Sequence, residues 1–133
     1  MSAPESLPRL IADALRAVVP LDLRATQKLL RASGGGVRIV HTSAALEIRV
    51  EVLVSPGPGT LRVKRRDALY LVLAGQGVLG MEGGDPLALA TGEAAVVPER
   101  VKHVVFGNPR LELLVVSAPG WRPVAPLATC RRA

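Results

Sequence analysis

Residues 92–108 read GEAAVVPERVKHVVFGN, and this stretch indicates how the chain folds. Two short runs of mainly apolar residues, 93–97 and 101–106, flank a polar turn that begins at Pro98. Short β-favouring runs separated by Gly, Pro or Asn are typical of strands joined by tight turns. The stretch therefore predicts two neighbouring strands.

The same pattern continues on both sides of this stretch. Further β-rich runs occupy 60–64, 68–74, 77–82, 87–90 and 110–117, with separators at Gly75, 83–86, 91–92 and 107–109. Upstream, Ile48, Val50 and Val52 alternate with Arg49 and Glu51, which is typical of a half-buried strand. Many short strands with no helices between them predict an all-β sandwich or barrel over residues 37–119.

Two helical stretches precede the strands. Apolar residues recur at helical spacing over 7–18, and Pro20 ends that pattern. A second helix is expected to begin after Asp22, a good N-cap residue, and to end at the glycines 34–36. We therefore predict an N-terminal helical segment over 1–36, one barrel domain over 37–119 and a Pro-rich tail over 120–133.

Composition limits the classes of function. Hydrophobic residues make up 49% of the 133 residues, but no apolar run reaches the roughly 20 residues that a membrane span needs. A lone cysteine, Cys130, and the absence of a secretion signal lead us to expect a cytoplasmic protein without a membrane partner. The net charge of +6 would attract anions, but aromatics amount to only 2%, which disfavours nucleic acid as a partner.

Three catalytic or cofactor motifs are disfavoured. Residues 75–80, GQGVLG, match the dinucleotide-binding pattern but continue into a strand and turn instead of a helix. A zinc site would have to use His41, His103 and Cys130, which stand at no recognised spacing. With two histidines and no exposed serine turn near either, a catalytic triad is not supported.

The stretch 92–108 resembles the second motif of the cupin family, and 56–75 resembles the first. Gly92, Pro98 and His103 have the spacing of the second motif, whereas Arg100 stands at its usual glycine and Asn108 comes one residue late. Counting back from Gly75 places Ala68 at the family's glutamate ligand. The family's two remaining histidine positions fall on Arg62 and Lys64.

The resemblance implies a cupin-type antiparallel β-barrel, a jelly roll, with N-terminal helices, and it suggests a homodimer. Strand alternation would bring Arg62, Lys64, Tyr70 and His103 together inside the barrel. Because two of the ligand positions carry cations, we expect no metal and no other cofactor.

Buried cations need compensation, and three solutions are open. Glu51, Glu82 or Glu112 could pair with them, the long side chains could reach the barrel mouth, or an anion could bind. The leading hypothesis is a metal-independent protein that binds a small carboxylate or phosphate with Arg62, Lys64, Tyr70 and His103, with no catalytic residue assigned. The alternatives are an isomerase, epimerase or lyase with His103 as base, and a non-catalytic regulatory or assembly protein with a basic surface.

Overall fold

The computed structural model describes residues 18–57, 59–119 and 125–126. The helix predicted from residue 7, Cys130 and nearly all of the tail lie outside these ranges. The elements are α2 (Leu23–Ala32), β1 (Gly36–Thr42), β2 (Glu47–Val54), β3 (Thr60–Leu61), β4 (Ala68–Met81), β5 (Leu87–Ala90), β6 (Ala94–Val97), β7 (His103–Ser117) and β8 (Ala125–Pro126).

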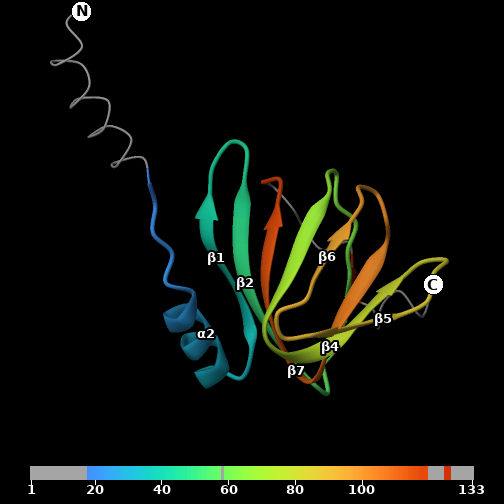
Figure 1. Ribbon diagram of the computed structural model, residues 1–133, viewed down its shortest axis with the longest axis horizontal. Helices are drawn as coiled ribbons and strands as arrows, with labels where there is room; N and C mark the ends of the chain where they lie inside the picture. Colours follow the sequence, from blue (N-terminus) through green and yellow to red (C-terminus); the bar gives the residue numbers. More distant parts are fainter. Residues whose placement is uncertain (1–17, 58, 120–124, 127–133) are drawn as a thin grey trace, which may run out of the picture.

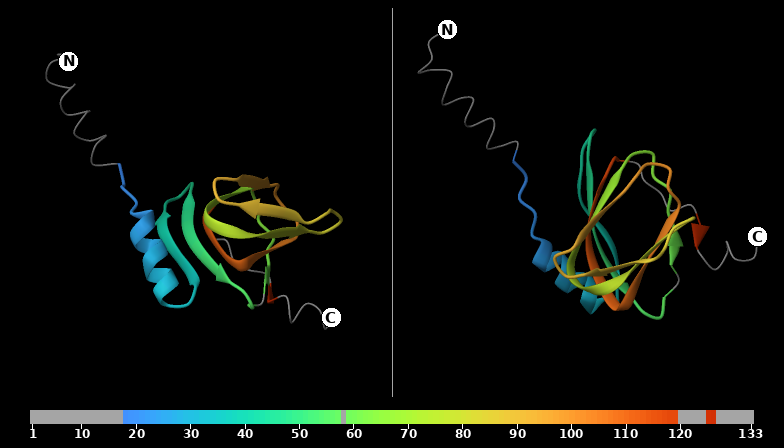
Figure 2. Two further views of the ribbon diagram at one scale, coloured as in Figure 1. Left: turned by 60° about the horizontal axis from the view of Figure 1, so that its bottom comes forward. Right: turned by 45° about the vertical axis from the view of Figure 1, so that its right-hand side comes forward.

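The strands form a strongly curved antiparallel sheet. Its order is β1-β2-β7-β4-β5, with β6 also pairing with β4, and a separate pair joins β3 to β8. Because β4 and β7 are long and bend, the sheet curls into a barrel, with α2 outside it against β1 and β2 (Figures 1 and 2). This all-β architecture confirms the fold class predicted from the sequence.

Two of the predicted turns are instead bends within long strands. The runs 68–74 and 77–82 are both part of β4, and 101–106 and 110–117 fall largely within β7. Register shifts occur in β4 between Val72 and Ala74 and between Gly75 and Gly77. A Cβ at Gly77 would clash with the Phe106 carbonyl oxygen, so glycine permits the close approach of β7 there. The separator predicted at Gly75 therefore does not end a strand, and β4 continues through it.

Helix α2 begins and ends where the sequence predicted. The Asp22 side chain accepts a hydrogen bond from the Ala25 amide at 3.0 Å, which satisfies one of the open donors of the first turn. Ser33 caps the other end, and Gly34 and Gly35 follow with positive φ. The buried Leu30 packs on Val50 and Val52, so α2 covers the outer face of β2.

Strand β2 is buried on both faces, which corrects the half-buried strand expected from its alternation. Val50 and Val52 lie under α2, whereas Glu47, Arg49 and Glu51 are also buried, on the opposite face. The polar face of this strand therefore points into the barrel. Its apolar face is the one that the helix covers.

The rest of the barrel interior is apolar. Its core is formed by Ala68, Tyr70, Val72, Leu79, Leu89, Val97, Val105, Leu111, Leu113 and Val115. Apart from Tyr70 these side chains are aliphatic, so Val, Leu and Ala fill the core of a chain poor in aromatics. Within the described ranges, no helix combines the length and apolar character that crossing a membrane requires.

Candidate functional site

A group of charged and polar side chains lies buried in the barrel, and we call it the interior cluster. Strand β2 contributes three members, β4 and β7 one each, and the segment after β3 two. Its members are Glu47, Arg49, Glu51, Arg62, Lys64, Tyr70 and His103. The structure thus brings together all four residues predicted to bind a ligand, and their binding role stays a prediction.

Glu51 is the central anion of the interior cluster. Arg62 donates to both of its carboxylate oxygens, from Nη1 at 3.1 Å and from Nη2 at 2.5 Å, and Arg49 donates from Nη2 at 2.7 Å. Burial alone would lower the pKa of Arg62, but the Glu51 carboxylate raises it above its ordinary value. Of the three solutions considered for Arg62, pairing with Glu51 is the one that the structure contains.

Lys64 is the third basic side chain of the interior cluster, beside Arg49 and Arg62. Its Nζ lies 5.6 Å from the centre of the Tyr70 ring, and the Arg62 guanidinium lies 5.8 Å from the same ring. Burial, reinforced by the charges of Arg49 and Arg62, lowers the pKa of Lys64 to about 7. The Lys64 amine therefore exchanges a proton near neutral pH, unlike an ordinary lysine.

Tyr70 and His103 form a hydrogen-bonded pair. His103 Nδ1 faces the Val101 carbonyl oxygen at 2.9 Å, which requires the ring proton on Nδ1. Nε2 then accepts from the Tyr70 hydroxyl at 2.7 Å. Burial lowers the pKa of His103 and raises that of Tyr70, so both side chains are neutral at pH 7.

The interior cluster does not fit the metal ion that cupins commonly hold. By the motif resemblance, three of the four ligand positions fall on Arg62, Lys64 and Ala68, and the fourth, His103, has its Nε2 engaged by Tyr70. The described part of the chain contains no group of three His, Cys, Asp or Glu side chains placed to hold a metal. Ammonium and guanidinium groups at these positions would repel a cation.

The other two glutamates proposed as partners for the interior cations lie elsewhere, so these two assignments were wrong. Glu82 is exposed in the turn after β4, with Lys102 at 4.0 Å. Glu112 is buried on the outer face of β7, beneath α2. There it contacts Gln27 at 2.9 Å, Arg31 at 2.8 Å and Arg110 at 3.0 Å, a group that we call the seam cluster.

A solvent-facing pocket of about 570 Å³ adjoins the interior cluster, and we call it the mouth pocket. It is lined by Val63, Lys64, Arg65, Arg66, Glu99 and Arg100. The Arg100 amide donates to the Lys64 carbonyl oxygen at 2.7 Å, and the Glu99 amide donates to Asp67 Oδ1 at 3.0 Å. These bonds fix the 64–67 loop against the 98–101 loop. Lys64 belongs to both the interior cluster and this pocket.

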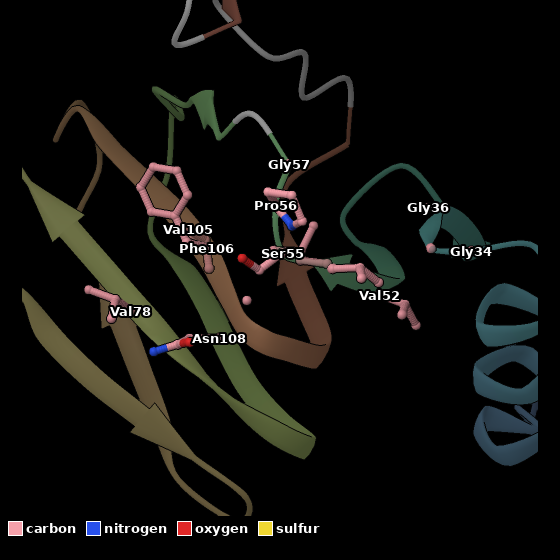
Figure 3. A pocket seen from close by; sticks show the side chains of 14 residues that line it. Gly34, Gly36, Val52, Ser55, Pro56, Gly57, Val78, Val105, Phe106 and Asn108 are labelled. Carbon is pink, nitrogen blue, oxygen red and sulfur yellow. The ribbon is translucent and has the colours of Figure 1, made fainter.

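A larger pocket, of about 670 Å³, lies at the Val54 end of β2 (Figure 3). It is lined by the glycines 34–36, residues 52–57 of β2 and the following turn, Val78 and the bend 105–108 of β7. Its side chains are apolar except for Ser55 and Asn108, and none carries a charge. This pocket has no ionisable side chain that could bind a charged ligand or transfer a proton, so the interior cluster is the better candidate site.

Sequence reasoning missed Glu47 and Arg49 as members of the interior cluster. The signal was present, because Glu51, proposed as an inward partner, shares a strand face with both residues. His41 is half-buried on β1. It is not a member of the interior cluster.

The barrel and its bent strands define the class of protein as a double-stranded antiparallel β-helix, and several solved structures that resemble it are cupins. A cupin-like protein from Thermotoga maritima superposes with a TM-score of 0.62 at 15% identity, covering 68% of this chain and 76% of that one. An RmlC-like cupin from Methanocaldococcus jannaschii gives a TM-score of 0.58 at 20% identity, covering 74% and 86%. The chain therefore has the cupin fold, as its motifs predicted.

These similarities concern the fold. The DMSP lyase DddQ from Ruegeria pomeroyi also superposes, with a TM-score of 0.57 at 20% identity, and the match covers 70% of this chain and 50% of the lyase. No family model matches the chain, and neither does any curated protein sequence. Function must therefore be argued from the side chains, because one fold hosts many chemistries.

Proposed function

We propose that the chain is a metal-independent cupin that binds a small anionic ligand, a carboxylate or a phosphate, at the interior cluster. The observation that carries this proposal is the position of Lys64. Its side chain is buried in the interior cluster with Arg49 and Arg62, and it also lines the mouth pocket, which opens to solvent. An anion that entered this pocket would come close to the Lys64 ammonium group.

The four residues would have different roles. Lys64 would meet the anion, because it lines the mouth pocket as well as the interior cluster. The Arg62 guanidinium would add positive potential at the site but would not bind the anion directly, since both of its Nη groups donate to Glu51. Tyr70 and His103 would form a neutral, polar wall behind the site.

The strength of the attraction between Lys64 and a bound anion follows from Coulomb's law. Two opposite unit charges 4 Å apart attract by about 4 kcal/mol at an effective dielectric of 20. An anion must therefore raise the pKa of Lys64 above its lowered value of about 7. Binding would take up a proton near neutral pH, and affinity would fall about tenfold per pH unit above that range.

Thermal-shift measurements with small carboxylates and phosphates at constant ionic strength test the proposal. We expect at least one anion to raise the melting temperature of the native chain and to have no effect on Lys64→Met. Lys102→Met is the matched control, because Lys102 is exposed and outside the cluster. If no anion stabilises the native chain, or if Lys64→Met responds equally, the proposal is wrong.

The alternative of an isomerase- or lyase-type enzyme finds some support in the Tyr70–His103 pair. In this pair the lone pair of His103 Nε2 faces the Tyr70 hydroxyl, so a proton would pass through Tyr70. Tyr70→Phe should then abolish turnover as fully as His103→Ala does. Activity that survives in Tyr70→Phe would exclude this route.

A further inference from the structure

The mouth pocket concentrates more positive charge than its neighbours balance. Lys64, Arg65, Arg66 and Arg100 line it, and the nearby acids are Glu99 in its lining and Asp67 in the same loop. Within the described part of the chain, the side chains of Arg65, Arg66 and Arg100 make no ion pair. A surface of this kind attracts multiply charged anions.

The two loops that present these arginines are held together. The Arg100 amide donates to the Lys64 carbonyl oxygen at 2.7 Å, and Asp67 accepts from the Glu99 amide at 3.0 Å. The loops also continue directly into β4 and β6, which pair from Ala68 and Val97 onward. The backbone that carries the guanidinium groups is therefore preorganised, which reduces the entropic cost of binding.

Arg100 adopts a backbone conformation that favours glycine. Its φ is +67°, and it is the one non-glycine residue with positive φ among those that the structure describes. The left-handed region is unfavourable for an ordinary residue, and glycine would relieve that strain. A non-glycine residue held in this conformation is a candidate for a role of its side chain.

Three guanidinium groups suit a phosphate better than a carboxylate. A phosphate offers three terminal oxygens and up to two charges, and guanidinium forks bind such oxygens in pairs. A carboxylate, with two oxygens and one charge, is satisfied by one fork. The pocket volume of about 570 Å³ holds a small molecule, not a helix or a strand of a partner.

We infer that the mouth pocket is a phosphate-binding subsite formed by Arg65, Arg66 and Arg100, so that the ligand is a small phosphorylated molecule. This inference rests on the proposed function, because it extends the anion site of Lys64 outward. The phosphate would occupy the mouth pocket, and a second polar or anionic group would face Lys64.

Calorimetric titration of the full chain at pH 7 tests the subsite with inorganic phosphate as the probe and acetate as the carboxylate comparison, at matched ionic strength. We expect Arg100→Asn to weaken phosphate binding at least tenfold and to leave acetate binding unchanged. Asparagine tolerates positive φ, so the unliganded melting temperature should not fall. The double variant Arg65→Gln/Arg66→Gln should weaken phosphate binding equally, and Arg38→Gln, on β1, is the matched control for charge.

The outcomes separate this inference from the proposed function. Unchanged phosphate binding in both Arg100→Asn and the double variant overturns the subsite, even if Lys64→Met abolishes acetate binding. If phosphate binding depends on Arg100 but acetate binding is unchanged in Lys64→Met, the subsite is supported and the interior anion site is contradicted. A short single-stranded RNA that binds more tightly than phosphate, with a steep salt dependence lost in the same variants, would instead assign the surface to nucleic acid.

Discussion

Two glutamates on neighbouring strands are each held by two arginines, but in opposite surroundings. Glu51 of β2 lies inside the barrel, where Arg49 and Arg62 are buried with it. Glu112 of β7 is equally buried beneath α2, but the side chains of Arg31 and Arg110 remain 37% and 50% exposed. The surroundings of the arginines, more than those of the carboxylate, therefore decide what each cluster can do.

In the seam cluster, water can screen the excess positive charge. In the interior cluster it cannot, and burial, reinforced by the charges of Arg49 and Arg62, lowers the pKa of Lys64. The seam cluster fastens the helix to the barrel. The interior cluster places a buried lysine with a lowered pKa beside the mouth pocket.

Removing the interior carboxylate should have the largest effect. Glu51→Gln leaves Arg49 and Arg62 buried without their main anion, and we expect a loss of about 3–5 kcal/mol in the free energy of unfolding. Urea denaturation monitored by circular dichroism measures this loss. Recovery of most of it in Glu51→Gln/Arg62→Gln would confirm the cause, and a loss below about 1 kcal/mol would contradict the enclosed pair.

The second prediction concerns pH. Because the folded pKa of Lys64 is about 7 and the unfolded value is 10.5, the unfolded chain binds more protons between these values. The free energy of unfolding should therefore rise with pH, by at most about 1.4 kcal/mol per unit. Denaturation from pH 7.5 to 9.5 avoids the titrations of His103 and Tyr70. A rise that persists in Lys64→Met would assign it to another group.

Glu112→Gln should cost less than Glu51→Gln. Arg31 and Arg110 can turn toward water when the carboxylate is lost, so we expect about 1–2 kcal/mol, most of it from the weakened contact between α2 and β7. The same urea experiment gives the comparison directly. A cost equal to that of Glu51→Gln would mean that exposure of the arginines does not matter.

Loss of the exposed ion pair between Glu82 and Lys102 should have the smallest effect on stability among these variants. The Glu82 side chain is 72% exposed and lies 4.0 Å from Lys102, so Glu82→Gln should change the free energy of unfolding by no more than about 0.5 kcal/mol. A larger loss would show that an ion pair contributes to stability in this protein whether or not it is buried.

The sequence predicted the barrel because its signals are local: alternation, turn residues and the spacing of Gly92, Pro98 and His103. It also placed Arg62, Lys64, Tyr70 and His103 together, since strand alternation fixes the side that each residue faces. It failed at Gly75 and at 107–109, where glycine and proline bend a strand instead of ending it. It also missed the role of Arg49, because a charged strand face that points inward has the same alternation as one that points to solvent.

The most direct test is a pH titration of Lys64, monitored by NMR of its side chain, in the absence and presence of inorganic phosphate. We predict a pKa near 7 without the anion and a clearly higher value with saturating phosphate, because an anion beside the ammonium group favours its charged form. A pKa close to 10.5 that phosphate does not move would contradict an anion site in this barrel.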